Sequence, residues 1–485
     1  MKKRLLLLIL IIAAFVFTYS CSFGDDVNEE IEDQIRSSSN IVYSFVFTDS
    51  DMDTSYDEEE AVIITLDDEE IDINGRGATS ENDVLKITED GTYIISGVLN
   101  DGQILVDTDK ESKIRIVLNG VSINNDDGSA VYVKQAAKVF LTMAEGSENS
   151  FSTTGEIKNI DENNIDAVIF SNDNLTINGE GCVTVSTDYG NGITSKDDLV
   201  FTGGTYKINV SGKALEAKDR VKIADGEYYL IAGDDGIHCE NDEEKEGTGY
   251  VYINDGNFTI FSGDDGIHGN SNVTINGGNI VIEEAYEGIE AQTVDINGGI
   301  IYIYTADDGI NAAGGNDGSS FHGLGSEETF SSEVEAYILI AGGELYIDAQ
   351  GDGVDANGNL YVTGGITYIS GITDEKDGAL DYNNEGIITG GTFVAAGKRE
   401  MAQNFSESST QASILVYADS IIDGNVELTD ADKNTMIEYY PNREYSCVVI
   451  SIPEIEKNGT YYINMGGTTK KVEMNGVIYS IGGTS

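Results

Sequence analysis

A short acidic motif recurs five times between residues 235 and 355 of the chain. In each copy a carboxylate residue precedes glycine and then isoleucine or valine, and a second polar residue follows three positions after the carboxylate. The first positions are Asp235, Asp265, Glu287, Asp308 and Asp352, and the second positions are His238, His268, Glu290, Asn311 and Asp355. Ca²⁺ takes oxygen ligands from carboxylates, amides and carbonyls, whereas zinc and copper favour nitrogen and sulfur. The eight oxygen-bearing residues are therefore candidate Ca²⁺ ligands, and the two histidines by themselves predict no site.

These turns also have a simpler interpretation, in which Asp-Gly only makes good turns and the carboxylates are solvated. We expect the copies to lie in neighbouring repeats, ~4.8 Å apart, where unscreened carboxylates repel one another strongly. That repulsion favours the calcium interpretation, because a bound cation removes it.

Tyrosine recurs at one position of the apolar segments that follow the glycine turns. The second and fourth residues of these segments are apolar, in the pairs Tyr206/Ile208, Tyr228/Leu230, Phe258/Ile260, Ile280/Ile282, Ile301/Ile303 and Leu345/Ile347. Alternate residues of a strand point to opposite faces, so the third residue points outward. This residue is Tyr229, Tyr302, Tyr346 or Tyr368 in four segments, and Tyr304 lies beside the strip. We predict an exposed aromatic strip that contacts sugar rings, the alternative being the β-propensity of tyrosine alone.

Four basic residues, Lys196, Lys213, Lys218 and Arg220, cluster near Asp197, Asp198 and Asp219. A polysaccharide lyase needs a Lys or Arg base to remove the proton next to a uronate carboxylate. Solvated surface charge is the commoner reason for such a cluster, so we predict no catalytic residues.

The elements that must position these residues follow a repeat. A short apolar strand and a glycine turn recur with first residues at Asn178, Thr202, Ala224, Asn254, Asn276, Asn297, Ala341, Thr363 and Thr389. Most successive positions are 21 to 26 residues apart, and the two longer intervals hold insertions at 241–248 and 314–334, the second long enough for one degenerate repeat. Such repeats predict an all-β fold, a single-stranded parallel β-helix, because stacked turns share a core that one turn cannot form. A β-propeller is the main alternative, but its blades need about 40 residues per repeat, more than the spacing found here.

The start of the chain predicts export. Residues 1–21 have a basic start, thirteen apolar residues from Leu5 to Phe17, and Thr18-Tyr19-Ser20-Cys21, which predict a lipoprotein signal peptide with Cys21 lipidated. An ordinary secretory signal is the alternative. Residues 22–60 hold thirteen acidic residues and one basic residue, Arg36, and predict an extended acidic tether, interrupted by a strand-like run at 41–47.

The rest of the chain divides in two. Residues 61–414 carry the repeat, and residues 415–485 have lost it and predict a β-rich C-terminal cap. The formal net charge of −59 excludes an electrostatic grip on nucleic acid or on an anionic membrane. The odd number of cysteines after Cys21 predicts no disulfide framework.

Several stretches are familiar in combination: 91–97 (GTYIISG), 117–123 (VLNGVSI), 144–149 (AEGSEN), 308–312 (DGINA), 351–358 (GDGVDANG) and 389–403, which begins TGGTFVAAG. Over residues 62 to 465 the chain resembles the extracellular carbohydrate-binding β-helix proteins, long classed as a domain of unknown function, one member of which binds cellulose and polygalacturonate. The resemblance implies a right-handed parallel β-helix, bound calcium, binding of acidic sugars or glucan, and distant kinship to pectate lyases. The extra acidic residues of this chain depart from the family and put the ligand in more doubt than the fold.

Residues and resemblance together predict a non-catalytic, Ca²⁺-dependent binding module for polysaccharide on the bacterial cell surface, held to the membrane by its lipid alone. The alternatives are a Ca²⁺-dependent pectate-type lyase and a structural surface adhesin without a sugar ligand.

Overall fold

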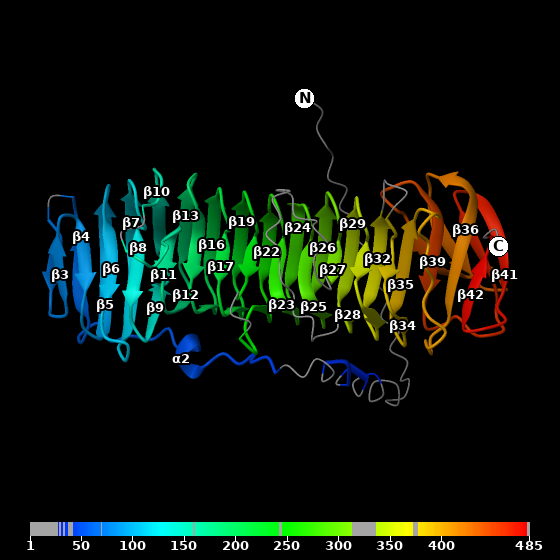
Figure 1. The fold of residues 1–485 in the computed structure, drawn as a ribbon, viewed down its shortest axis with the longest axis horizontal. Coiled ribbons are helices and arrows are strands. Elements are labelled where there is room, and N and C mark those ends of the chain that lie inside the picture. The colour runs from blue at the N-terminus through cyan, green and yellow to red at the C-terminus, as the bar shows by residue number, and fades with distance from the viewer. Residues whose placement is uncertain are drawn as a thin grey trace, which may run out of the picture.

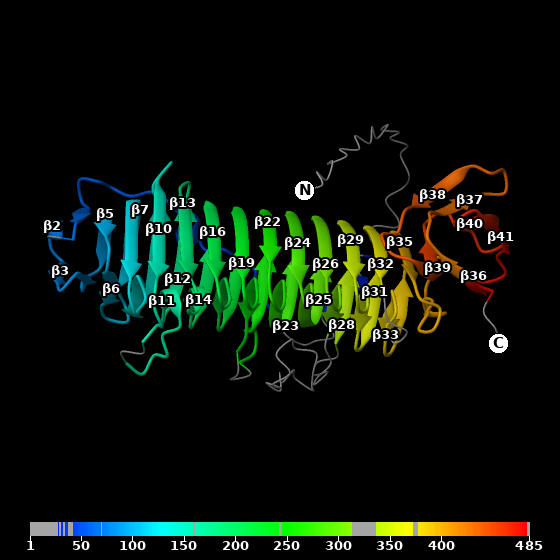
Figure 2. The ribbon, with the colours of Figure 1, turned by 90° about the horizontal axis from the view of Figure 1, so that it is seen from above.

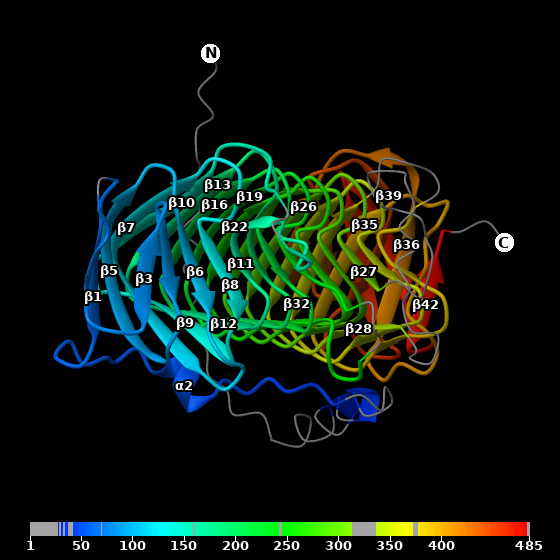
Figure 3. The ribbon, with the colours of Figure 1, turned by 60° about the vertical axis from the view of Figure 1, so that its left-hand side comes forward.

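The computed structural model describes residues 28, 31–32, 34–36, 42–68, 70–158, 161–241, 245–312, 336–371 and 377–482. It is an elongated stack of strands, with the earliest and latest strands at opposite ends (Figures 1 and 2). Seen from near one end, the strands wind around a single interior (Figure 3). Nearly every strand of the stack pairs in parallel with strands one turn before and after it. The parallel β-helix predicted from the repeat is confirmed.

Three sets of strands run along the stack, and each set forms one face. The tyrosine face contains the second parts of β5 (Gly91–Leu99) and β7 (Lys113–Asn125), then β10 (Glu148–Thr153), β13 (Cys182–Thr187), β16 (Thr205–Val210), β19 (Glu227–Ala232), β22 (Asn257–Phe261), β24 (Asn279–Ala285), β26 (Ile300–Thr305), β29 (Glu344–Ala349), β32 (Ile366–Gly371) and β35 (Thr392–Gly397).

The acidic face follows the tyrosine face within each turn. It contains β4 (Val84–Ile87), β6 (Gln103–Asp107), β8 (Val131–Gln135), β11 (Ala167–Ser171), β14 (Asn191–Ser195), β17 (Leu215–Ala217), β20 (Ile237–Cys239), the first parts of β23 (Ile267–Ile275) and β25 (Ile289–Ile296), β27 (Ile310–Ala312), β30 (Val354–Ala356) and β33 (Asp381–Tyr382).

The strap face completes each turn. It contains β1 (Val62–Leu66), the first parts of β5 and β7, β9 (Lys138–Met143), β12 (Asn174–Gly179), β15 (Asp198–Phe201), β18 (Arg220–Ile223), β21 (Tyr250–Ile253), the second parts of β23 and β25, β28 (Tyr337–Ile340), β31 (Asn359–Val362) and β34 (Gly386–Ile388).

The glycine turns lie between the strap face and the tyrosine face. Gly343 and Gly365 have φ angles of 79° and 74°, and a Cβ on Gly365 would lie 2.7 Å from the carbonyl oxygen of Gly342 in the preceding turn. Only glycine meets both demands, the left-handed backbone and the close approach of the next turn. The recurrence of this turn therefore follows from the stacking itself.

The inward residues form one continuous core. Ile280, Ile301 and Leu345 pair in register on consecutive turns, and each is 0% exposed. Across the second insertion, Thr293 pairs directly with Tyr337. The turns before and after residues 313–335 therefore stack on each other, without an additional turn between them.

Antiparallel strands close both ends of the stack. At the start, β2 (Asp72–Asn74) pairs with β1, and β3 (Ala78–Glu81) pairs with β4. At the other end, β39 (Tyr445–Ser451) lies between β35 and β36 (Ser413–Ile422), and β42 (Ile478–Ile481) follows β36. A second sheet contains β37 (Val426–Thr429), β38 (Thr435–Tyr439), β40 (Thr460–Met465) and β41 (Thr468–Glu473). These strands cover edges that a parallel stack would leave unpaired.

The described part of residues 28–60, which we call the strap, lies along the strap face instead of leaving the body as a tether (Figures 1 and 3). Near its start the Asn28 amide donates to the Thr363 carbonyl at 2.9 Å. In its short helix α2 (Asp49–Met52), the Asp51 carboxylate accepts from the Thr176 hydroxyl at 2.6 Å. The strap thus runs along the stack in the direction opposite to the order of the turns.

Specific contacts explain why the strap docks despite its charge. The Phe45 ring stacks on Tyr252 with centroids 4.4 Å apart. Arg36, the single basic residue of the segment, donates to the Asp295 carboxylate at 3.2 Å. These contacts exist only on the assembled stack and outweigh the repulsion that the composition predicts. Residues 42–48, predicted in part as a strand, belong to no strand.

None of the helices that the structure describes is long and apolar enough to cross a bilayer. The predicted signal peptide and lipidation site, residues 1–21 with Cys21, lie outside the described residues.

Candidate functional site

The copies of the acidic motif are stacked in register on the acidic face. The second positions pair turn by turn in the order His238, His268, Glu290, Asn311 and Asp355. The first positions are aligned through the backbone, since the Asp265 N–H donates to an Asp235 carboxylate oxygen at 3.0 Å and the Asp352 N–H to Asp308 at 2.5 Å. The structure therefore brings together all ten residues, which we call the acidic column.

The acidic column is buried. Apart from the half-buried Asp355, and Asp308 at the turn, its members are between 1% (Asn311) and 8% (Asp352) exposed. In the first two copies the second residue folds back against the first, in the contacts of His238 with Asp235 at 2.7 Å and of His268 with Asp265 at 2.9 Å. The alternative of solvated turn carboxylates is therefore wrong for most of the column.

The upstream end carries its own counter-charge. The Lys213 ammonium lies 3.0 Å from the Asp235 carboxylate and 2.9 Å from Nδ1 of His238. Burial would raise the pKa of Asp235, but Lys213 and His238 outweigh it and hold this pKa well below its usual range. Burial and Lys213 would lower the pKa of His238, but hydrogen bonds to Asp235 and Glu240 leave it raised. This end therefore needs no bound cation.

Three side chains converge at the middle of the acidic column. His268 Nδ1 lies 2.9 Å from an Asp265 oxygen and 3.1 Å from a Glu290 oxygen. One ligand atom of each residue lies within 4.8 Å of the others. Burial and the charge of Glu290 raise the pKa of Asp265 well above its usual range. His268, which the sequence pattern placed in the motif but did not predict as a metal ligand, thus belongs to this cluster.

The downstream part of the column is acidic alone. Asp308, Asp352 and Asp355 bring their carboxylate oxygens within 4.8 Å of one another. Burial, then the neighbouring carboxylates, raises the pKa of Asp308 to about 8 and that of Asp352 to about 9. Near neutral pH such a cluster holds either protons or a cation. With the amide of Asn311 nearby, these residues fit the hard oxygen set that Ca²⁺ takes.

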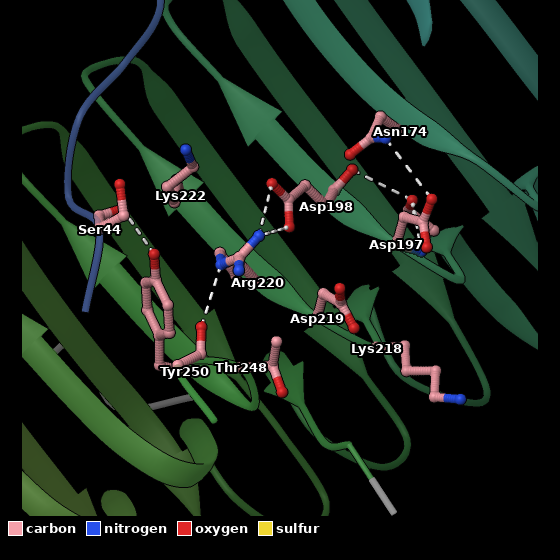
Figure 4. Close-up of polar contacts among 12 residues, drawn as sticks. Ser44, Asn174, Asp197, Asp198, Lys218, Asp219, Arg220, Lys222, Thr248 and Tyr250 are labelled. Atoms are coloured by element: carbon pink, nitrogen blue, oxygen red, sulfur yellow. Dashed lines mark hydrogen bonds and ion pairs between the residues drawn. The ribbon is translucent and has the colours of Figure 1, made fainter. Parts of the chain in front are cut away.

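The basic residues considered for lyase chemistry do not converge on one point. Figure 4 shows Arg220, the first residue of β18, beside Asp198, where its guanidinium donates to both carboxylate oxygens at 2.9 and 3.2 Å. Lys196 pairs with Asp166 at 3.0 Å, and Lys213 pairs with Asp235 of the acidic column at 3.0 Å. Burial would lower the pKa of Lys213, but Asp235 and neighbouring carboxylates raise it. A general base must be unprotonated, which these ion pairs oppose.

The predicted tyrosine strip is in register on the tyrosine face. The ring centroids are 4.7 Å apart between Tyr302 and Tyr346, and 5.8 Å apart between Tyr346 and Tyr368, with planes 10° and 14° from parallel. Tyr439 of β38 extends the stack, 4.9 Å from Tyr368. The rings thus turn their faces to one another and are half-buried, not exposed as the alternation predicted, and the Tyr346 hydroxyl donates to Glu344 at 3.1 Å. Tyr229, 46% exposed, is three turns away from Tyr302, with the non-aromatic Thr259 and Val281 between them.

Tyr304 lies differently from the stacked rings. It is 38% exposed and lines a hollow of about 240 Å³ where the tyrosine face meets the C-terminal strands. The other charged or amide side chains around this hollow are Glu283, Glu284, Asp348, Gln350 and Arg443. Arg443 pairs with Asp348, which also accepts from Asn442 at 3.0 Å. The sequence pattern found Tyr304 but missed Arg443, because no repeat spacing links residues that are 95 positions apart.

Comparison with known proteins identifies the central part of the chain. Residues 81–319 match the model of a family described as carbohydrate-binding domain-containing protein. A curated protein of the same description from Acetivibrio thermocellus is 41% identical over 133 residues, which are 27% of this chain and 46% of that protein. The chain thus matches slightly under half the length of that relative.

A solved structure, titled as a polysaccharide lyase-like protein from C. thermocellum in a gadolinium derivative, is 32% identical, covers 52% of this chain and 97% of its own, and has a TM-score of 0.44. The carbohydrate-binding family domain holds the acidic column as far as Asn311, together with Tyr302 and Tyr304. Tyr346 and Arg443 lie beyond the matched residues. The family resemblance predicted from the sequence motifs is confirmed.

Proposed function

We propose that the protein binds a polysaccharide without cleaving it and that Ca²⁺ supports the binding. The observation that carries this proposal is the row of tyrosines on the tyrosine face, which leads to the hollow beside Tyr304. An extended polysaccharide has the same linear shape, so several weak contacts add along its length. The carbohydrate-binding family of residues 81–319 supports the same class of ligand.

Ca²⁺ has its best-fitting residues in the downstream acidic column. We assign Asp308, Asn311, Asp352 and Asp355 as its ligands, with Glu287 adjoining them through the Asn311 amide at 3.1 Å. Asp308 follows Tyr304 by four residues on the same turn, so the ion would lie close to the sugar site. The bound Ca²⁺ would neutralise the buried carboxylates of this downstream cluster.

Charge sets the expected choice of glycan. With a net charge of −59, the protein repels an acidic sugar unless a cation lies between them. We therefore propose Ca²⁺-dependent binding of acidic polysaccharides such as polygalacturonate, and weaker dependence on Ca²⁺ for a neutral glucan.

Tyr304→Ala is expected to weaken glycan retention at least tenfold, or about 1.4 kcal/mol. Tyr304 is the tyrosine of the hollow, whereas the stacked rings present mainly their edges. The triple substitution of Tyr302, Tyr346 and Tyr368 by Ser is expected to weaken it as well, through loss of the hydroxyl row. Affinity gel electrophoresis against polygalacturonate and against soluble glucan, each with Ca²⁺, measures both effects.

The matched control is Tyr440→Ala, which removes a tyrosine that is 65% exposed and lies outside the strip. It should leave retention unchanged. Unaltered retention by a folded Tyr304→Ala protein would remove the hollow from the proposed site, and unaltered retention by the folded triple variant would remove the strip.

No lyase activity is expected, because three of the four candidate bases, Arg220, Lys196 and Lys213, are held in ion pairs with Asp198, Asp166 and Asp235. Incubation with polygalacturonate and Ca²⁺ should give no ultraviolet absorbance from an unsaturated product. Absorbance that appears with the wild type and disappears with Lys213→Ala would overturn the non-catalytic assignment in favour of a Ca²⁺-dependent lyase.

We also propose that the protein is exported and anchored to a bacterial membrane through lipidated Cys21. Metabolic labelling with a fatty acid, lost on Cys21→Ser, tests the anchor.

A further inference from the structure

The cluster at the middle of the acidic column differs in chemistry from the oxygen-only cluster downstream. Its three members, Asp265, His268 and Glu290, are 6%, 2% and 5% exposed. They come from two consecutive turns, whose register pairs His268 with Glu290. Imidazole nitrogen suits zinc, iron and other transition ions, whereas Ca²⁺ is bound by oxygen.

The distances within the cluster suit a small ion. Ligands 2.0 to 2.2 Å from a zinc-sized ion are roughly 2.8 to 3.6 Å apart when the angle between them is octahedral to tetrahedral. His268 Nδ1 lies 2.9 Å from the Asp265 oxygen and 3.1 Å from the Glu290 oxygen. Ca²⁺ needs longer bonds, of about 2.3 to 2.6 Å, and more oxygens.

Charge also suits a dication at this cluster. When both buried carboxylates are ionised they carry two negative charges, which one divalent ion balances. The neutral imidazole is the form of histidine that binds metals.

We propose that Asp265, His268 and Glu290 form a binding site for one divalent transition ion of the Mn²⁺ or Zn²⁺ type, separate from the Ca²⁺ residues downstream. The three side chains leave coordination positions for water or a further ligand. The carboxylates of the acidic column would then be neutralised in three different ways along the stack. A lysine neutralises them at the upstream end, a transition ion in the middle and Ca²⁺ downstream. This site does not depend on glycan binding.

Metal titration of the full mature chain tests the site. After removal of metal with a chelator, the wild type should bind one equivalent of Mn²⁺ or Zn²⁺ in calorimetry performed in excess Ca²⁺. His268→Gln should weaken that binding at least tenfold. His238→Gln, at the paired position one turn upstream, is the matched control and should change it less than twofold. The rise in melting temperature with Ca²⁺ should persist in His268→Gln, which separates this site from the proposed Ca²⁺ site.

Pulsed electron paramagnetic resonance of the wild type with one equivalent of Mn²⁺ gives a second readout that needs no variant. A nitrogen coupling from one imidazole is expected. The proposal is overturned by full displacement of Mn²⁺ by Ca²⁺, by equal affinity of wild type and His268→Gln, or by the lack of a nitrogen coupling. Each of these results would leave the three residues as a hydrogen-bonded ion pair.

Discussion

Asp352→Asn is expected to remove most of the effect of Ca²⁺, and part of the effect of pH, on the stability of the protein. In the folded state the pKa of Asp352 is raised to about 9 and that of Asp308 to about 8, first by burial and then by neighbouring carboxylates. An unfolded carboxyl has a pKa of about 4. A raised folded pKa gives stability that is complete below the unfolded value and is lost as the pH rises toward the folded value.

The chelated wild type should therefore melt at progressively lower temperature as the pH rises from about 5 to about 9. Ca²⁺ binds the ionised carboxylates, so its stabilisation should be largest at the alkaline end. At a free Ca²⁺ concentration of 100 times Kd the gain is about 2.7 kcal/mol per site. Melting curves at several pH values, with chelator and with Ca²⁺, measure both trends.

Asp352→Asn supplies a neutral side chain of the same size, so the chelated variant should be more stable than the chelated wild type at alkaline pH and should respond little to Ca²⁺. Glu385→Gln is the matched control, because Glu385 is an exposed carboxylate one turn further along the stack. A wild type whose melting temperature is independent of Ca²⁺ at every pH would contradict the calcium assignment.

Asp51→Ala is expected to release the strap from the strap face. The Asp51 side chain is 1% exposed and accepts from the Thr176 hydroxyl at 2.6 Å and the Lys138 ammonium at 2.5 Å. Removing one partner of a buried ion pair costs about 3 to 5 kcal/mol, because the other charge stays behind without compensation. Amide exchange over residues 42–53 should therefore rise by at least tenfold, while the core strands of the stack keep their protection.

Asp49→Ala, in the same helix α2 but exposed, is the control and should change exchange little. Acid should mimic the loss of the Asp51 charge. Burial alone would raise the pKa of Asp51, but Lys138, Thr176 and Thr48 lower it to about 2. The docking stability that this carboxylate provides is therefore present above pH 4 and is lost as the pH falls toward 2. A strap that is equally protected in Asp51→Ala and wild type would show that its other contacts hold it without this carboxylate.

The local pattern of the sequence was sufficient for the fold and for the alignment of the candidate site. Glycine recurs at the position of Gly365 because a side chain there would meet Gly342 of the preceding turn. An apolar residue recurs at the position of Ile301 because one core runs through all turns. In a stack, each residue contacts the same position one turn away, so sequence spacing translates directly into spatial neighbours. For this reason the pairing of Glu290 with Asn311 and of Tyr346 with Tyr368 followed from counting residues alone. The pairing of Tyr302 with Tyr346 did not, because the insertion between them is long enough for one more repeat.

Tertiary structure decided what spacing does not encode. Side-chain packing, which the repeat length does not determine, decided three features. They are the burial of the acidic column, the orientation of each tyrosine ring toward the next, and the position of His268 between Asp265 and Glu290. The docking of the strap and the pairing of Arg443 with Asp348 join segments far apart in the chain, and no local pattern relates them. Composition predicted a self-repelling tether because it counts charges within one segment. The folded stack supplies the aromatic rings and counter-charges, such as Tyr252 and Lys138, that hold the segment in place.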